Sequence, residues 1–77
     1  MTVSDRIKEC REAHGLSKAQ LAKKAGFSRA TITHIEQRRT DGLSAITLKK
    51  LADVLGVSTD YLLGRVGHRK FERFKRK

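Results

Sequence analysis

The sequence predicts an all-α fold, a compact bundle of five helices around one core. Apolar residues recur at intervals of three and four positions, which is the spacing of one face of an α-helix. The 77 residues include no proline, and four of the six glycines (positions 15, 26, 56 and 64) follow such apolar stripes, where helices end. A chain of this length buries roughly 60 % of its unfolded surface, which indicates one domain without a deep catalytic cleft.

The first helix is expected to end at Gly15, and either Thr2 or Ser4 could cap its start. The residues expected on its inward face are Ile7, Cys10 and either Ala13 or His14, followed by Leu16 just after the helix. Cys10 is the single cysteine, so it cannot form an internal disulfide. A small reduced core residue is a better interpretation of Cys10 than a reactive thiol.

The second helix is expected at Lys18–Lys24. Ser17 and Gln20 match the Ser-x-x-Gln form of the capping box, in which each side chain binds the main chain of the other residue. Gly26 lies where the helix needs a residue that tolerates positive φ in order to end. The apolar stripe of this segment consists of Leu21, Ala22 and Ala25.

The third helix is expected at Arg29–Arg38, with Ser28 as its N-cap and with Ile32 and Ile35 on its inward face. Helices this short are not stable alone in water, so other elements must pack against the second and third helices. With the glycine turn between them, these two helices form a helix-turn-helix pattern. We expect the exposed face of the third helix to carry the function.

Two further helices complete the predicted bundle. Ser44 can cap the fourth helix, which ends at Gly56, and Ser58 can cap a short fifth helix, which ends at Gly64. Their apolar residues are Leu48, Leu51, Ala52 and Leu55, then Tyr61, Leu62 and Leu63. Residues 38–43, between the third and fourth helices, are rich in turn-forming residues and predict a surface loop.

The net charge of +10 is concentrated in two segments. Residues 18–39 carry six basic side chains against Glu36 alone, and residues 65–77 carry seven against Glu72. The remainder of the chain is close to neutral. This distribution predicts a polyanionic partner, with nucleic acid favoured over a membrane surface.

The predicted helices and the charge distribution divide the chain into a helix-turn-helix domain at residues 1–64, expected to bind nucleic acid, and a basic C-terminal tail at residues 65–77. In the tail, Phe71 and Phe74 lie three positions apart among basic residues. The tail could therefore be a sixth amphipathic helix, a solvated basic arm or a linker to another domain.

Several other classes of protein are disfavoured. No apolar run approaches the roughly 18–20 residues of a membrane span, and the polar N-terminus is unlike a signal peptide, so an intracellular protein is expected. The histidines, His14, His34 and His68, lack metal-ligand spacing, and one cysteine cannot complete a zinc site. The sequence has no persuasive nucleophile–base grouping, phosphate-binding glycine loop or paired carboxylates. We therefore expect no enzymatic activity, no metal and no cofactor.

The sequence resembles the phage-repressor and Cro-like helix-turn-helix family, also called the xenobiotic-response-element family. The resemblance runs from Arg6 to Gly64. It rests on Arg6-Ile7-Lys8, Arg11, Gly15-Leu16-Ser17, Gln20-Leu21-Ala22, Ala25-Gly26, Ser28, Ile32, Ile35-Glu36, Leu51-Ala52, Leu55-Gly56-Val57 and Asp60-Tyr61-Leu62-Leu63-Gly64. The resemblance implies a lambda-repressor-like five-helix bundle that binds double-stranded operator DNA in the cytoplasm of a bacterium or phage-infected cell, in association with the nucleoid. The run after Glu36 departs from the family, since it has no proline and one extra residue.

Base contacts are expected from the N-terminal end and outer face of the third helix, because that end enters the major groove. The candidates are Arg29, Ala30, Thr33 and His34. Arg29 could donate two hydrogen bonds to guanine O6 and N7, and Ala30 or Thr33 could meet a thymine methyl group. A phosphate contact or a solvated side chain is the alternative for Arg29.

Phosphate contacts are expected at the start of the second helix, where N–H groups and the helix dipole favour an anion, and beyond the third helix. The candidates are Ser17, Lys18, Gln20, Ser28, Arg38, Arg39 and Thr40. An ordinary exposed lysine is the alternative for Lys18, and Lys23 and Lys24 are expected to be solvated.

The resemblance also implies two structural roles. The arginine and glutamate that match Arg11 and Glu36 form an ion pair between the first and third helices of the family and orient the recognition helix. Family members are commonly dimers, at least on DNA, with a contact around the fifth helix. In this chain the corresponding residues are Val57, Tyr61, Leu62 and Arg65. Tyr61 could instead be a core residue.

The predicted function is that of a sequence-specific, DNA-binding transcription regulator, a repressor of the phage or mobile-element type. A controller protein of a restriction-modification system is a close variant. An antitoxin, whose fold is the same but whose task is to bind a toxin, is an alternative of another class, and a membrane-surface module acting through the tail is a third. A protein partner such as a toxin or a polymerase is left open by the sequence.

Overall fold

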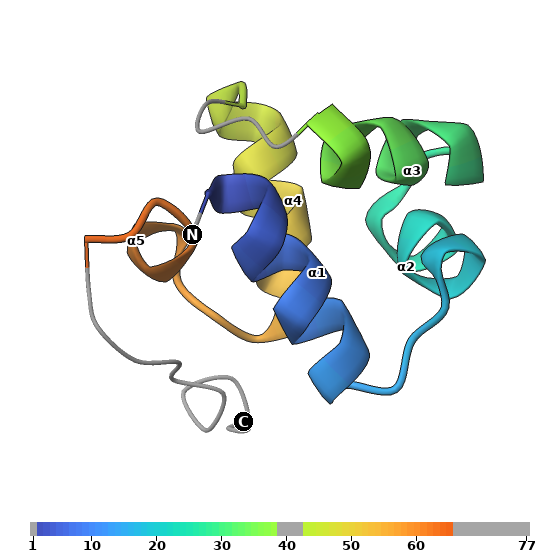
Figure 1. Ribbon diagram of the computed structural model, residues 1–77, viewed down its shortest axis with the longest axis horizontal. Helices are drawn as coiled ribbons and strands as arrows, with labels where there is room; N and C mark the ends of the chain where they lie inside the picture. The colour runs from blue at the N-terminus through green and yellow to red at the C-terminus, as the bar shows by residue number, and fades with distance from the viewer. Residues whose placement is uncertain (1, 39–42, 66–77) are drawn as a thin grey trace.

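The computed structural model describes residues 2–38 and 43–65, except the side chain of Arg38. This part of the chain forms five α-helices and no strand, which confirms the all-α prediction. The helices are α1 (Val3–Ala13), α2 (Lys18–Ala25), α3 (Arg29–Arg38), α4 (Ala45–Leu55) and α5 (Thr59–Leu62) (Figure 1). Most of the predicted loop and all but Arg65 of the predicted tail lie outside the described residues.

The helix starts follow the hydroxyl residues of the sequence. Thr2, not Ser4, caps α1, because Thr2 and Asp5 exchange side-chain and main-chain hydrogen bonds in a capping box. Ser17 and Gln20 form the predicted capping box of α2, and α4 and α5 begin after the expected serines. The four glycines predicted to end helices all have positive φ, between +70° and +83°.

The turn between α2 and α3 shows why one of these glycines is needed. Gly26 has φ +82°, a left-handed conformation that is costly for residues with a Cβ. It lets the chain reverse at once, so that the N–H of Phe27 donates to the carbonyl of Ala22 at 2.8 Å. Ser28 then accepts a hydrogen bond from the N–H of Thr31 at 3.1 Å and starts α3.

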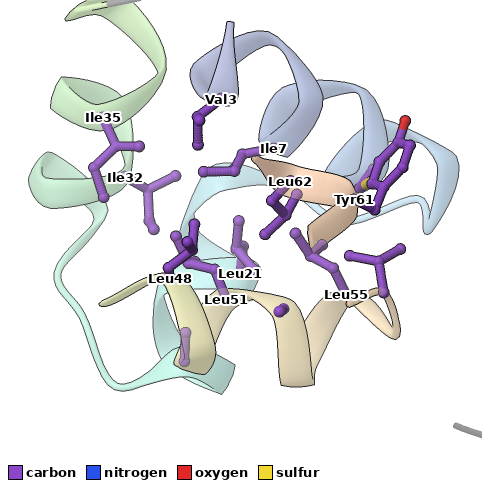
Figure 2. Packing of buried hydrophobic residues seen from close by; sticks show 14 of the residues in the cluster. Val3, Ile7, Leu21, Ile32, Ile35, Leu48, Leu51, Leu55, Tyr61 and Leu62 are labelled. Carbon is purple, nitrogen blue, oxygen red and sulfur yellow. The ribbon is translucent and has the colours of Figure 1, made fainter. Parts of the chain in front are cut away.

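All five helices contribute to one apolar core (Figure 2). Ile32 and Ile35 of α3 point into it beside Val3 and Ile7 of α1 (Figure 2). The fully buried residues with the largest side chains are Ile7, Leu21, Ile32, Leu51, Leu55 and Leu62. Cys10 is buried there as well, as predicted for a small core residue.

The inward face of α1 differs from the prediction at its C-terminal end. Ala13, the last residue of α1, and His14, its C-cap, are both exposed. The buried face of α1 therefore ends at Cys10 and Arg11. His14 Nε2 lies 2.5 Å from the carbonyl oxygen of Leu55, at the end of α4.

Two helices hold α3 at one edge of the molecule (Figure 1). Helix α2, which precedes the turn, packs against α3, and so does α1. Both contacts bury the face that carries Ile32 and Ile35. The opposite face of α3 is consequently left toward solvent.

Candidate nucleic-acid interface

The outward face of α3 contains the residues predicted to read bases. Arg29, Ala30 and His34 are exposed and Thr33 is half-buried. Since the buried residues on this helix are Ile32, Ile35 and Glu36, the centre of the opposite face runs through Ala30, His34 and Gln37. The structure thus brings the four predicted base-contacting residues onto one surface.

Gln37 is a further exposed residue of this surface that the sequence prediction missed. It follows Ala30 and His34 at the spacing i, i+4 and i+7, and this spacing could have identified it. Its amide can both donate and accept hydrogen bonds. Within the described part of the chain, Arg29, Thr33, His34 and Gln37 show no side-chain hydrogen bond or ion pair, so their polar atoms are available to a ligand.

The start of α2 is capped, and two of its main-chain N–H groups remain without a partner in the described chain. Ser17 Oγ accepts from the N–H of Gln20 at 3.1 Å, and Gln20 Oε1 accepts from the N–H of Ser17 at 2.8 Å. The two intervening N–H groups, of Lys18 and Ala19, have no partner within the described residues. Such groups, with the positive end of the helix dipole, suit a phosphate oxygen.

The other predicted phosphate-contacting residues fall into two groups. Ser28 is exposed at the start of α3, where its hydroxyl bonds to Thr31 as the N-cap. Lys18 is half-buried, whereas Lys23 and Lys24 on the same helix are exposed. The side chain of Arg38, and Arg39 and Thr40 entirely, lie outside the described residues.

The structure also brings Arg11 and Glu36 together. Arg11 Nε donates to Glu36 Oε2 at 2.7 Å and Nη2 donates to Oε1 at 3.1 Å, a two-point contact between α1 and α3. A third donor, Nη1, binds the carbonyl of Leu16 at 2.8 Å. Both residues are only 8 % exposed, so the pair is shielded from competing water.

This contact also shifts the pKa of Arg11. Its hydrogen bond to the Glu36 carboxylate raises the pKa of the Arg11 guanidinium, although burial acts in the opposite direction. Because the shift is upward, protonation of Arg11 stabilises the folded chain, and this contribution of Arg11 is fully present below the pKa of an unfolded arginine. It is lost as the pH rises through the higher pKa of Arg11 in the folded chain, far above neutrality.

A second contact on the N-terminal side of α3 was not predicted. Lys50 of α4 places its ammonium group 5.6 Å from the centroid of the Phe27 ring, within the range of a cation–π interaction. Phe27 is half-buried and directly precedes Ser28. The contact therefore links α4 to the turn from which α3 begins, and no sequence spacing indicates it.

The residues predicted for a dimer contact are mostly used within one chain. Val57 and Leu62 are fully buried and Tyr61 is 7 % exposed, so their side chains belong to the core and leave little apolar surface for a second copy. The alternative interpretation of Tyr61 as a core residue therefore fits its position, and its hydroxyl donates to Glu9 Oε1 at 3.2 Å. Arg65 alone of the four is at the surface, 3.5 Å from the carboxylate of Asp60.

Other kinds of site are not found in residues 2–38 and 43–65. This part of the chain has no pocket and no group of histidine, cysteine, aspartate or glutamate residues that could hold a metal ion. His68 lies beyond the described residues. No helix in these ranges is long and apolar enough to cross a membrane.

Comparisons with known proteins agree with this geometry. The model of the helix-turn-helix family HTH_3 matches residues 7–62. The immunity repressor protein of Bacillus phage phi105 is 39 % identical over 64 residues, which are 83 % of this chain and 44 % of that protein. An uncharacterised HTH-type transcriptional regulator of Bacillus subtilis strain 168, RghRB, is 40 % identical over 62 residues, which are 80 % of this chain and 45 % of that protein. The chain thus spans less than half the length of either relative.

Among solved structures, the chain resembles SinR of Bacillus subtilis, described as the master regulator for biofilm formation, in complex with DNA. The TM-score is 0.75 at 35 % identity, over 80 % of this chain and 98 % of that one.

Proposed function

Because this chain belongs to the helix-turn-helix family HTH_3, we propose that it is a sequence-specific DNA-binding transcription regulator of the repressor type. Its α3 enters the major groove of operator DNA and reads base edges with Arg29, Ala30, Thr33 and His34. The start of α2 binds the phosphate backbone beside it. The function is binding and not catalysis.

One observation carries this proposal. The inward face of α3 is fixed by core packing and by the Arg11–Glu36 pair, while the outward face holds polar side chains without partners in the described chain. A helix face with exposed donors and acceptors that have no partner in the described chain suits recognition of the major groove, where each base pair presents a distinct set of donors and acceptors. The positive charge of residues 18–39 supplies attraction to phosphate.

The comparisons support the same conclusion. A relative is named an immunity repressor, and the structure similar to this chain is of a regulator bound to DNA. A repressor of the phage type is therefore the form of the function that we favour. A homodimer on DNA follows from the small number of bases that one short helix can read, with half-sites about 34 Å apart.

Selection of bound duplexes from a random pool tests the proposal directly. The wild-type chain is expected to enrich one motif, repeated with two-fold symmetry at a spacing of about one helical turn. Enrichment of a single motif without a symmetric repeat would support sequence-specific DNA binding but would reject the homodimer. A pool that stays random after several rounds, while total DNA binding persists, would reject sequence-specific recognition.

A further inference from the structure

Helix α1 contacts the C-terminal half of α3 through a second polar contact besides the ion pair. Ser4 Oγ donates a hydrogen bond to the main-chain carbonyl of Ile35 at 2.6 Å, and Ser4 is fully buried. The ion pair joins Arg11 to Glu36, the next residue along α3. Two residues that lie two turns apart on α1, roughly 10 Å along its axis, therefore hold a single turn of α3.

The two contacts restrain α3 in different directions. In an α-helix the main-chain carbonyls lie nearly along the axis, since they bond to residues one turn further on, whereas side chains project outward. The Arg11–Glu36 contact therefore restrains rotation of α3 about its axis. The bond from Ser4 to Ile35 restrains movement of α3 along its axis. Together they define where the N-terminal end of α3 lies.

Burial makes the Ser4 bond effective. Water cannot replace the hydroxyl at a site with 0 % exposure, so its removal would cost the Ile35 carbonyl a partner that solvent does not restore. The main chain of α3 could then relax by a small shift. Base recognition tolerates a displacement of only about 0.5 Å, while long, flexible side chains that bind phosphates tolerate more.

We propose that Ser4 is a positioning residue for DNA recognition, which acts by fixing the axial position of α3 without touching DNA. This inference rests on the proposed function, in which the outward face of α3 reads bases. A positioning role differs from that of an ordinary core residue in its effect on DNA binding. Loss of the Ser4 hydroxyl lowers discrimination between DNA sequences more than it lowers affinity for DNA in general.

The test compares dissociation constants for two duplexes, the selected half-site and a scrambled half-site of the same composition. Ser4→Ala is expected to reduce the ratio between them about three- to tenfold, as for the loss of part of one two-point base contact. Affinity for the scrambled duplex and its dependence on salt should stay at the wild-type values, because no cationic group is removed.

Ser58→Ala is the matched control. It removes the same hydroxyl group from another serine, whose Oγ accepts from the N–H of Tyr61 at 2.9 Å and caps α5, away from α3. This variant should lose stability but keep the wild-type ratio. Both variants are measured at a temperature at which circular dichroism finds wild-type helix content.

The other possible results also decide whether Ser4 is a positioning residue. If Ser4→Ala does not fold, Ser4→Cys keeps the shape of the side chain with a larger atom and a weaker donor, and an intermediate ratio is expected. A wild-type ratio in a folded Ser4→Ala or Ser4→Cys, or an equal loss in Ser58→Ala, would overturn the positioning role. Failure of the wild-type chain to distinguish the two duplexes would instead overturn the proposed function, and this inference with it.

Discussion

On one face of α3, Ile32, Ile35 and Glu36 are 0, 6 and 8 % exposed, whereas on the opposite face Ala30, His34 and Gln37 lie in solvent. The inward face takes part in the core and in a buried ion pair. The outward face, with Arg29, has polar groups that the described part of the chain does not satisfy. Substitutions on the two faces should therefore have separable effects, on folding for the inward face and on DNA recognition for the outward face.

Arg11→Met should produce the largest effect, on the inward side. It leaves the Glu36 carboxylate buried without its partner, which typically costs about 3–5 kcal/mol of unfolding free energy. Equilibrium urea titration followed by circular dichroism measures the loss. The matched control is Lys49→Met, since Lys49 is paired with Asp53 at 3.5 Å on the surface and should lose at most about 0.5 kcal/mol. If Arg11→Met were nearly as stable as the wild type, the buried ion pair would not stabilise the fold, and the inward face of α3 would not differ from the outward face in this respect.

Arg29→Ala should affect the outward face alone. Loss of a two-point contact to guanine is expected to remove about 1–3 kcal/mol of discrimination at one base pair. The unfolding free energy should change by no more than about 0.5 kcal/mol, because the side chain is exposed. Selection from the random pool measures the preference, and Lys23→Ala, which removes the same charge from the exposed side of α2, is the control. Preference that is unchanged at every position would reassign Arg29 to phosphate binding or to solvent.

The sequence predicts the features of α3 that depend on local patterns, and it does not predict those that depend on contacts between distant residues. The bounds of α3, Arg29–Arg38, were predicted from Ser28 and the apolar spacing, because caps and periodicity are local properties. The contact between Arg11 and Glu36 is implied by the family resemblance and by no local spacing in the sequence. The bond from Ser4 to Ile35 joins residues far apart in the sequence, and no local pattern encodes it.

One difference from the prediction has an identifiable cause. The start of α1 was ambiguous between two hydroxyl residues, although Thr2 with Asp5 three positions later matches a capping box and could have decided it. The dimer contact at Val57, Tyr61, Leu62 and Arg65 is implied by the family resemblance, and it stays a prediction. Three of these side chains, Val57, Tyr61 and Leu62, are buried within the single chain.

A smaller effect is expected at the start of α2, which flanks the outward face. Lys18→Ala should weaken binding to all duplexes alike and reduce the slope of log affinity against log salt by about one, the value for one lost phosphate contact. Affinities measured at several salt concentrations give the slope. Lys49→Ala is the comparison, because its ammonium is paired with Asp53 and should leave the slope unaltered. Equal slopes in Lys18→Ala and the wild type would make Lys18 an ordinary surface lysine.

The smallest effect is expected where α4 meets the turn before α3. Lys50→Gln removes the cation from the Phe27 ring but keeps most of the aliphatic chain, so the unfolding free energy should fall by about 0.5–1 kcal/mol. The same change in a Phe27→Leu background should have almost no effect, because leucine offers no aromatic face. Urea titration of the wild type, the two single variants and the double variant gives the coupling energy between the two side chains. If Lys50→Gln cost as much with leucine as with phenylalanine, the ring would not be the partner. The N-terminal end of α3 would then depend on Gly26, Ser28 and core packing, while the C-terminal end keeps two buried polar contacts.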